Sequence, residues 1–225
     1  MNSLAVLTDP SSPYEYRVVS AGVGQKIHVW DLLTARTCFI MDGHIDEVLS
    51  VAAVRTPNNA HYQAIDKLPN KAKQSGKYLT EIPRGSHDAE NVVIISGGRD
   101  RRIWVWDYRG RKAIYMFRGH SDVVTVVSGF VSRSGQLIIV SGSDDCTLKL
   151  WSMSSCSCVS SQRHHDRSVR GLSTLPLLQS GAAAQAFSTA YKSTIIATGG
   201  WDKKIKSHHE TVGEYGIGRS ICSIM

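Results

Sequence analysis

The sequence has 225 residues, of which 42% are hydrophobic and 20% charged, and its formal net charge is +7 at pH 7. This length allows one domain with a buried core, and the composition excludes a fibrous or wholly disordered chain. The positive charge favours acidic partners. The apolar run at residues 4–7 is too short for a signal peptide and no later segment is long enough to span a bilayer, so we expect no membrane partner.

Short runs rich in β-branched and aromatic residues follow one another along the chain, separated by turns that contain Gly or Asp. Such runs predict β-strands joined in hairpins. They cover residues 18–20, 26–30, 92–96, 102–106, 137–141 and 147–151. We therefore expect an all-β chain built from small sheets.

The residues that mark these strands recur at a fixed spacing, which indicates an internal repeat. A spacing of 45 residues holds for three pairs: Ser96 and Ser141, Asp100 and Asp145, Trp106 and Trp151. One repeat earlier the spacing is 76 residues, which places an insertion of 31 residues in the polar, Lys-rich stretch of about 56–90. One repeat later the spacing is 57 residues, which places a smaller insertion near 176–193.

Two dipeptides accompany this period: Trp-Asp at 30–31 and 106–107, and Gly-His at 43–44 and 119–120. Through them, and through the shared Ser/Thr, Asp and Trp register, the chain resembles the WD40-repeat family over nearly all of residues 1–206. The resemblance implies an all-β, WD40-type β-propeller of about four blades. The repeats then fall at about 1–42, 43–118, 119–163 and 164–206, and residues 207–225 form a divergent tail outside them.

The family's pattern also implies a hydrogen-bonded group of four side chains, here called a tetrad, in each of repeats two and three. Its indole and imidazole supply donors and its hydroxyl and carboxylate supply acceptors, so a half-buried polar chain can be satisfied. The residues are His44, Ser96, Asp100 and Trp106, then His120, Ser141, Asp145 and Trp151. We expect a structural role for them, because a Ser, His and Asp in this context are not a catalytic triad.

No enzyme motif accompanies the repeats. The sequence contains no phosphate-binding Gly-x-x-x-x-Gly-Lys-Ser/Thr loop, no His-Glu-x-x-His zinc motif and no Gly-x-Ser-x-Gly elbow. We therefore expect no catalytic activity and no cofactor.

The fourth repeat departs from the pattern at its end. Trp201-Asp202 looks like a closing Trp-Asp pair, but by register Asp202 is a turn residue and His208 stands at the Trp position. We therefore expect the third strand of this blade to be broken after Lys206. Repeat one lacks its turn Asp and has Gly24 there. Neither end supplies an obvious ring-closing strand. We therefore expect an incomplete, open arc of a larger propeller, which self-associates or needs another chain or missing residues to close.

The cysteines indicate a reducing compartment. Their number is odd and their spacing shows no disulfide framework, which favours free thiols in the cytoplasm or nucleus. The five are Cys38, Cys146, Cys156, Cys158 and Cys222. A zinc site at Cys156 and Cys158 would need His164 and His165 as further ligands, and we expect two half-buried strand thiols and no metal instead.

The resemblance implies where partners bind. In this family the common docking surface is the mouth of the ring, formed by the loops after the fourth strands and the turns between second and third strands. The matching positions are Glu47, Leu49, Arg99, Val123, Thr125, Asp144, Ser168, Arg170 and Trp201. We expect a non-catalytic scaffold for protein–protein interaction, of adaptor or substrate-receptor type, that binds acidic peptides through this mouth.

The alternative is an RNA- or ribosome-associated propeller. Seven basic and two acidic residues lie between Arg99 and Arg118, and the Lys-rich insertion is expected to project from the face opposite the mouth. Both could contact phosphates, which makes nucleic acid a secondary expectation. Salt-dependent retention of RNA by the protein would distinguish the RNA-binding hypothesis from the protein-interaction hypothesis.

Overall fold

The computed structural model describes residues 1–8, 16–56, 91–132, 135–177, 193–213 and 216–224. Within these ranges the chain forms strands β1 to β16, and no helix long and apolar enough to cross a bilayer occurs among them.

The strands form four antiparallel sheets, each made of four strands that follow one another in sequence, and we call these sheets blades 1 to 4. Blade 1 consists of β1 (Ser3–Thr8), β2 (Tyr16–Ala21), β3 (Lys26–Asp31) and β4 (Arg36–Asp42). Blade 2 consists of β5 (Val48–Thr56), β6 (Asn91–Gly98), β7 (Arg102–Asp107) and β8 (Lys112–Arg118). Blade 3 consists of β9 (Val124–Val131), β10 (Leu137–Ser143), β11 (Thr147–Ser152) and β12 (Ser157–Arg163). Blade 4 consists of β13 (Val169–Leu177), β14 (Ser193–Gly200), β15 (Ile205–Gly213) and β16 (Gly216–Ile224).

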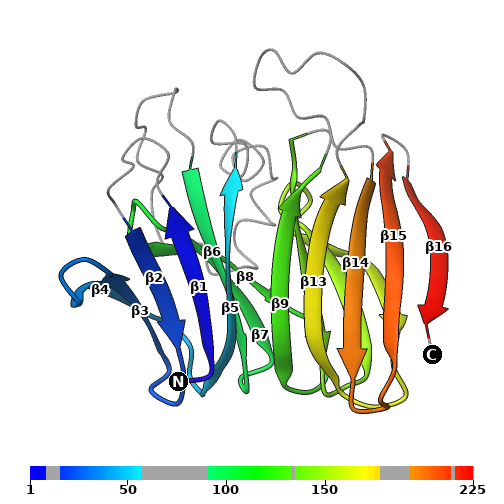
Figure 1. Cartoon of the computed structure of the whole chain (residues 1–225), viewed down its shortest axis with the longest axis horizontal. Helices are drawn as coiled ribbons and strands as arrows, with labels where there is room; N and C mark the ends of the chain where they lie inside the picture. The colour runs from blue at the N-terminus through cyan, green and yellow to red at the C-terminus, as the bar shows by residue number, and fades with distance from the viewer. Residues whose placement is uncertain (9–15, 57–90, 133–134, 178–192, 214–215, 225) are drawn as a thin grey trace.

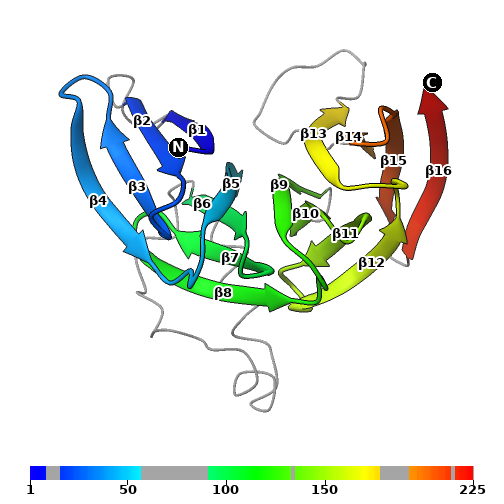
Figure 2. The same cartoon turned by 90° about the horizontal axis from the view of Figure 1, so that it is seen from below.

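The blades stand side by side along an open arc (Figure 2). The first strand of each blade lies on the inner side of the arc and the fourth strand on the outer side. The two chain ends belong to the two end blades, as Figure 1 shows. An unclosed arc of four-stranded antiparallel sheets confirms the predicted fold class.

The core lies between the blades, so a central blade is buried on both faces. Val93, Ile94 and Ile95, three successive residues of β6, are each 0% exposed. A strand covered on both faces reads as a continuous apolar run, whereas a half-exposed strand alternates. The run at 92–95 therefore reflects the place of blade 2 between two neighbours.

Glycines allow the blades to approach each other closely. A Cβ added at Gly97 in β6 would lie 2.5 Å from Val124 Cγ1, and one added at Gly142 in β10 would lie 2.6 Å from Val169 Cγ1. Both contacts join one blade to the first strand of the next. The Ser-Gly pair shared by repeats two and three thus sets the packing distance between blades.

The end of the chain differs from our expectation. β15 pairs with β14 through residues 205–210 and with β16 along its whole length, so the prediction that this strand is broken after Lys206 is wrong. Backbone hydrogen bonds form the sheet, and they do not require a Trp in the strand. The register is the predicted one, because His208 pairs with Ile196 as Trp106 pairs with Ile94. The backbone of the predicted divergent tail supplies most of β15 and all of β16.

Both predicted insertions fall between the first and second strands of a blade. The longer one lies between β5 and β6, and the residues 57–90 and the face they occupy are outside the described residues. The shorter one is narrower than expected, because Pro176 and Leu177 belong to β13 and Ser193 to β14, while residues 178–192 are also outside the described ranges.

Candidate functional site

In blade 3 four side chains form a continuous hydrogen-bonded chain. The Trp151 indole N–H donates to Ser141 Oγ at 2.8 Å, and this hydroxyl lies 2.7 Å from His120 Nε2. His120 Nδ1 lies 2.7 Å from Asp145 Oδ2. The His comes from the loop before the blade, Ser141 from β10, Asp145 from the following turn and Trp151 from β11. The chain therefore ties the entry loop to the two central strands.

Blade 2 repeats this arrangement. The Trp106 indole N–H donates to Ser96 Oγ at 2.8 Å, and Ser96 Oγ lies 2.8 Å from His44 Nε2. His44 Nδ1 lies 2.9 Å from Asp100 Oδ2. The rings also pack, with the Trp106 centroid 6.3 Å from that of His44.

The charge states in blade 3 follow from burial and hydrogen bonding. Burial alone would raise the pKa of Asp145, but hydrogen bonds from Thr147 and His120 outweigh it and lower the pKa to about 2. Burial lowers the pKa of His120, although the hydrogen bond to Asp145 opposes this. At neutral pH we therefore infer an ionised carboxylate and a neutral imidazole, which donates from Nδ1 and accepts the Ser141 hydroxyl proton at Nε2.

This arrangement uses each of its polar hydrogens internally. Ser141 is 0% exposed, and its oxygen already contacts both the indole and the imidazole. A nucleophilic serine needs access to its substrate. The tetrad geometry therefore fits a structural group.

The end blades carry partial versions. In blade 4, His165 Nε2 lies 3.0 Å from Thr198 Oγ1 and its Nδ1 lies 2.9 Å from Asp202. In the described part of blade 1 the Trp30 indole N–H donates to Ser20 Oγ at 2.7 Å, and Gly24 stands at the position of the turn Asp. The tetrads are thus complete where a blade has neighbours on both sides.

The turn between the second and third strands is tied to the entry loop by the same backbone bond in blades 2 to 4. The donor and acceptor pairs are Arg99 with Glu47, Asp144 with Val123 and Trp201 with Ser168, at N···O distances of 2.9, 3.0 and 3.0 Å. Two residues further on, each turn has a positive φ, of 60° at Arg101, 67° at Cys146 and 63° at Lys203. One backbone geometry therefore presents the residue before the turn Asp at the same place in each of these blades.

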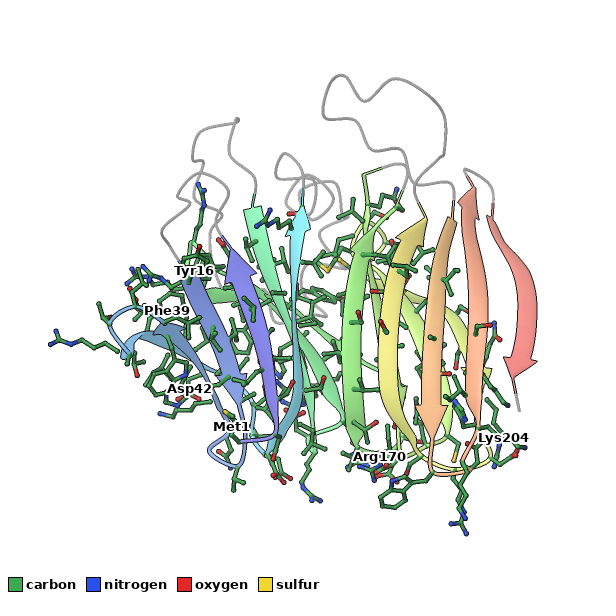
Figure 3. All side chains as sticks on the ribbon, in the orientation of Figure 1. Met1, Tyr16, Phe39, Asp42, Arg170 and Lys204 are labelled. Carbon is green, nitrogen blue, oxygen red and sulfur yellow. The ribbon has the colours of Figure 1, made fainter. Side chains whose placement is uncertain are left out.

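These loops and turns form one end of the blades, which we call the tetrad rim. It comprises residues 43–47, 99–101, 119–123, 144–146, 164–168 and 201–204, together with Arg170 at the start of β13. The rim lies at the lower edge of Figure 1, and Figure 3 shows Arg170 and Lys204 at this end of blade 4.

Two groups of the expected partner residues meet on this rim. Between blades 1 and 2, Glu47 accepts a hydrogen bond from Asn2 at 2.8 Å and forms a 2.6 Å ion pair with Arg99. The hydrogen bonds from Asn2 and Arg99 lower the pKa of Glu47. This group is charged but internally paired.

The second group joins blades 3 and 4. Asp144 accepts a hydrogen bond from Ser168 Oγ at 2.5 Å and lies 3.1 Å from Arg170 Nη2. The Arg170 guanidinium lies over the Trp201 ring, 4.1 Å from its centroid. Trp201 is nevertheless 61% exposed. We call Asp144, Ser168, Arg170 and Trp201 the Trp201 cluster.

The other three expected contact residues are less accessible. Thr125 is buried, and its hydroxyl contacts the carbonyl oxygens of Gly142 and Val169. Leu49 and Val123 are half-buried. Thr125 therefore joins two blades instead of facing a partner, which the spacing alone could not reveal.

The structure adds rim residues that the register did not select. Ile45 is 64% exposed in the loop before blade 2, and Lys204 forms a 2.9 Å ion pair with Asp166. Asn2 reaches Glu47 from the start of the chain. Asn2 does not stand at a position that the repeat pattern marks, so its contact with Glu47 could be found only from the structure.

The basic run between Arg99 and Arg118 does not form one patch. Arg99 and Arg101 lie in the turn before β7, whereas Arg109 and Arg111 lie in the turn after it. A six-residue strand separates the two turns by about 20 Å. Sequence neighbours joined by a strand thus face opposite ends of the blade.

The residues of the zinc alternative are separated in the same way. Cys156 precedes β12 and His164 follows it, so they lie at opposite ends of a seven-residue strand. The cysteines whose side chains are described, Cys38, Cys146, Cys156 and Cys158, are free thiols.

Comparison with known proteins agrees with the repeats. The family described as "WD domain, G-beta repeat" matches residues 111–152. The chain is 35% identical to pre-mRNA-processing factor 19 of Bos taurus over 80 residues, covering 36% of this chain and 15% of that protein. It is 26% identical to striatin-4 of Mus musculus over 203 residues, covering 80% and 26%. With the U3 small nucleolar RNA-associated protein 15 homolog of Xenopus laevis it shares 29% identity over 122 residues, covering 54% and 20%.

The matched part of the chain thus spans about a quarter or less of each of these relatives. The repeat match, the hydrogen-bonded tetrads and the arc of four-stranded blades together support the assignment of the chain to the WD40-repeat family.

Proposed function

We propose that this protein is a non-catalytic adaptor that binds other proteins through the tetrad rim, with the Trp201 cluster at the centre of the contact. The observation that carries the proposal is a tryptophan that is 61% exposed and lies under an arginine. Tryptophan and arginine are the residues most enriched among those that dominate protein–protein binding energy.

The cluster is held in place before a partner binds. The Arg170 guanidinium is fixed by Asp144, and Asp144 also accepts a hydrogen bond from Ser168. The Trp201 backbone N–H is bonded to the Ser168 carbonyl oxygen at 3.0 Å. Side chains that are already ordered lose less entropy on binding, so such a cluster supports affinity.

The pairing of charges on the rim indicates which kind of peptide would bind. The rim arginines Arg99 and Arg170 are paired with Glu47 and Asp144, which reduces the positive charge available to an acidic peptide. A peptide that places an apolar side chain against Trp201 therefore fits the cluster better than one recognised by charge alone.

The RNA alternative rests on weaker support. One relative carries small nucleolar RNA in its name, but the basic run of blade 2 is divided between two ends of the blade. The expected cytoplasmic or nuclear location also remains a proposal, which the names of the pre-mRNA-processing and small nucleolar RNA relatives support. RNA binding is accordingly an outcome to be separated by experiment.

The test compares partners captured by the wild-type chain and by Trp201→Ala, with cross-linking mass spectrometry to locate the contacts. Leu33→Ala is the matched control, because Leu33 is 69% exposed but lies in the turn between β3 and β4, away from the rim. Arg170→Lys is a second variant, which keeps the charge but loses the planar stacking group.

After nuclease treatment, we expect wild type and Leu33→Ala to capture the same set of proteins, cross-linked to rim residues. Trp201→Ala should reduce the captured amount of these proteins at least tenfold. Arg170→Lys should give an intermediate loss. Equal capture by Trp201→Ala and wild type would contradict the proposal. Capture that disappears with nuclease would favour the RNA alternative.

A further inference from the structure

The third strand of a blade begins at the tetrad rim, opposite the residue with which the fourth strand ends. These two residues form a cross-strand pair at the same place in blades 1 to 3. The pairs are Lys26 with Asp42, Arg102 with Arg118, and Thr147 with Arg163. Blade 2 differs from its neighbours because both members of its pair are positively charged. We call Arg102 and Arg118 the Arg pair.

The two arginines of the Arg pair repel each other. Directly opposite side chains of an antiparallel pair have Cβ atoms about 5 Å apart on the same face of the sheet, and like charges at this distance are destabilising. Blade 1 holds an attractive pair at the same place, where Lys26 Nζ lies 3.1 Å from Asp42 Oδ2. The fold accommodates complementary charges there, so the repulsion in blade 2 is not required by the backbone.

No acidic side chain of the described ranges neutralises the Arg pair. Among these residues neither Arg102 nor Arg118 forms an ion pair, and Arg118 is exposed. The carboxylates near this end of blades 1 and 2 are bound to other partners. These are Asp42 with Lys26, Glu47 with Arg99, and Asp100 with His44. The Arg pair therefore presents two guanidinium groups that receive no counter-charge from the described part of the chain.

The Arg pair lies at the rim end of the junction between blades 1 and 2. Trp104 and Met116, which form a cross-strand pair two residues further along the same strands, belong to the core cluster of this junction. Side chains two residues apart on a strand point to the same face, so Arg102 and Arg118 lie on the side of blade 2 that faces blade 1. The loop between β4 and β5 reaches this side, because the His44 and Trp104 ring centroids lie 5.8 Å apart.

We propose that the Arg pair binds the phosphoryl group of a phosphorylated serine or threonine in a partner protein. Such a group carries a charge of about −1.5 to −2 at pH 7 and three strong acceptor oxygens. Two guanidinium groups match this charge, and each can donate two parallel hydrogen bonds to phosphate oxygens. A carboxylate brings a single charge and would leave part of the repulsion between the arginines. The site is separate from the Trp201 cluster, and the proposal does not use that cluster.

The charges around the Arg pair favour a peptide over a nucleic acid. A nucleic-acid strand carries a negative charge at every nucleotide, so its binding requires several cations along the strand. Asp42 and Asp46, which lie just before and within the loop between β4 and β5, are exposed, and Arg109 and Arg111 lie at the other end of blade 2. A continuous polyanion would be repelled by these carboxylates, whereas a single phosphoryl group can bind between the two arginines.

The test measures the affinity of the full chain for fluorescein-labelled peptides by fluorescence polarisation at constant ionic strength. The probe is a degenerate peptide pool with one central phosphoserine, and two matched pools carry Ser or Glu at the centre. Wild type should bind the phosphoserine pool at least tenfold more tightly than the Ser and Glu pools. Arg102→Gln and Arg118→Gln should each reduce this affinity at least tenfold, because each removes charge-assisted hydrogen bonds to the phosphoryl group. Equal binding of the phosphoserine and Glu pools by wild type would overturn the proposal.

Arg163→Gln is the matched control. Arg163 is exposed and occupies the position of Arg118 in blade 3, but it faces Thr147 instead of a second arginine. This variant loses the same net charge as Arg118→Gln, and its affinity for the phosphoserine pool should change less than twofold. An equal loss of affinity in Arg163→Gln and Arg118→Gln would indicate general attraction to a basic protein and would contradict a site at the Arg pair.

Single-stranded RNA of mixed sequence is the probe for the nucleic-acid alternative. It should compete with the phosphoserine pool only weakly, because the Arg pair offers two cations at one point. If the RNA bound wild type more tightly than the phosphoserine pool and lost this affinity in Arg102→Gln, the site would be assigned to nucleic acid and the proposal would be wrong.

A second measurement tests the repulsion within the Arg pair without any ligand. Thermal unfolding is followed in chloride buffer without phosphate for wild type and the three Gln variants. Arg102→Gln and Arg118→Gln each remove one of two like charges, so the thermal midpoint should rise by about 1–3 °C, while Arg163→Gln should leave it unchanged. Lower midpoints for both Arg102→Gln and Arg118→Gln would mean that the two arginines stabilise the unliganded chain, and the proposal would fail.

Discussion

Replacing Ser141 by Ala tests whether the tetrad stabilises the fold. The Ser141 hydroxyl is fully buried and contacts both the Trp151 indole N–H and His120 Nε2, at 2.8 and 2.7 Å. Ser141→Ala removes the shared partner and leaves one buried donor and one buried acceptor unsatisfied. Each unsatisfied buried group costs about 1–3 kcal/mol, so the free energy of unfolding should fall by about 2–5 kcal/mol.

Ser20→Ala in blade 1 is the matched control. Ser20 accepts one hydrogen bond, from the Trp30 indole at 2.7 Å, and Trp30 is partly open to water. Water can replace this partner, so we expect a loss of about 0.5–1.5 kcal/mol. Both changes remove one oxygen, but Ser141→Ala leaves two buried partners unsatisfied, whereas Ser20→Ala leaves one partner that water can reach.

The assays are equilibrium unfolding in urea, which gives the free energy, and thermal unfolding, both monitored by tryptophan fluorescence and circular dichroism under identical conditions for the two variants. At about 2–4 °C per kcal/mol, the thermal midpoint should fall by about 4–20 °C for Ser141→Ala and by about 1–6 °C for Ser20→Ala. Equal losses, or a larger loss for Ser20→Ala, would refute the argument that the complete tetrad is what stabilises a central blade.

Three further predictions follow from the same geometry. Asp145→Asn should make the stability of the protein less dependent on pH in acid. Because the fold lowers the pKa of Asp145 from 3.8 to about 2, this carboxylate contributes stability above pH 3.8 that is lost as the pH falls toward 2, about 1 kcal/mol between pH 6 and pH 3. If the free energy of unfolding of variant and wild type fell in parallel over this range, the prediction would be contradicted. Gly142→Ala should lower the free energy of unfolding by about 1–3 kcal/mol, because its Cβ would lie 2.6 Å from Val169 Cγ1. Gly24→Ala is the control and should change the urea midpoint little, because a Cβ at Gly24 would have no atom within 4 Å. Amide hydrogen exchange should be slowest in β6 and β10 and faster in β1, since the central strands are covered on both sides; uniform protection would argue against blades of unequal stability.

The fold could be predicted because its evidence is periodic. Ser96, Asp100 and Trp106 recur 45 residues later, and the hydrogen bonds of the tetrad require those residue types at those offsets. A spacing of this kind identifies the second strand, the turn and the third strand together. The same spacing placed Trp201 in a turn instead of at a strand end, and that turn is where the structure has it.

The contacts on the rim were harder to predict. The register located the two turns that carry Arg99 and Trp201. It did not show that Arg99 pairs with Glu47 or that Arg170 lies over the Trp201 ring. The Thr125 side chain was placed on the docking surface because of its offset from His120, whereas it is buried between two blades. Offsets give the position of the backbone, and side-chain exposure depends on the neighbouring blade, which lies tens of residues away in sequence.

The end blades show the limit of the repeat pattern most clearly. Blade 4 keeps the hydrogen bonds of His165 to Thr198 and Asp202, and its third and fourth strands form by backbone pairing without a Trp at position 208. The loss of a sequence marker therefore did not mean the loss of a strand. A Trp in the third strand fills the gap against the preceding blade, so its absence weakens the packing of a blade without preventing the sheet. Trp30 in blade 1 shows the converse, since it keeps both the third-strand position and the indole hydrogen bond to Ser20 and is only partly buried, so the marker alone does not determine burial.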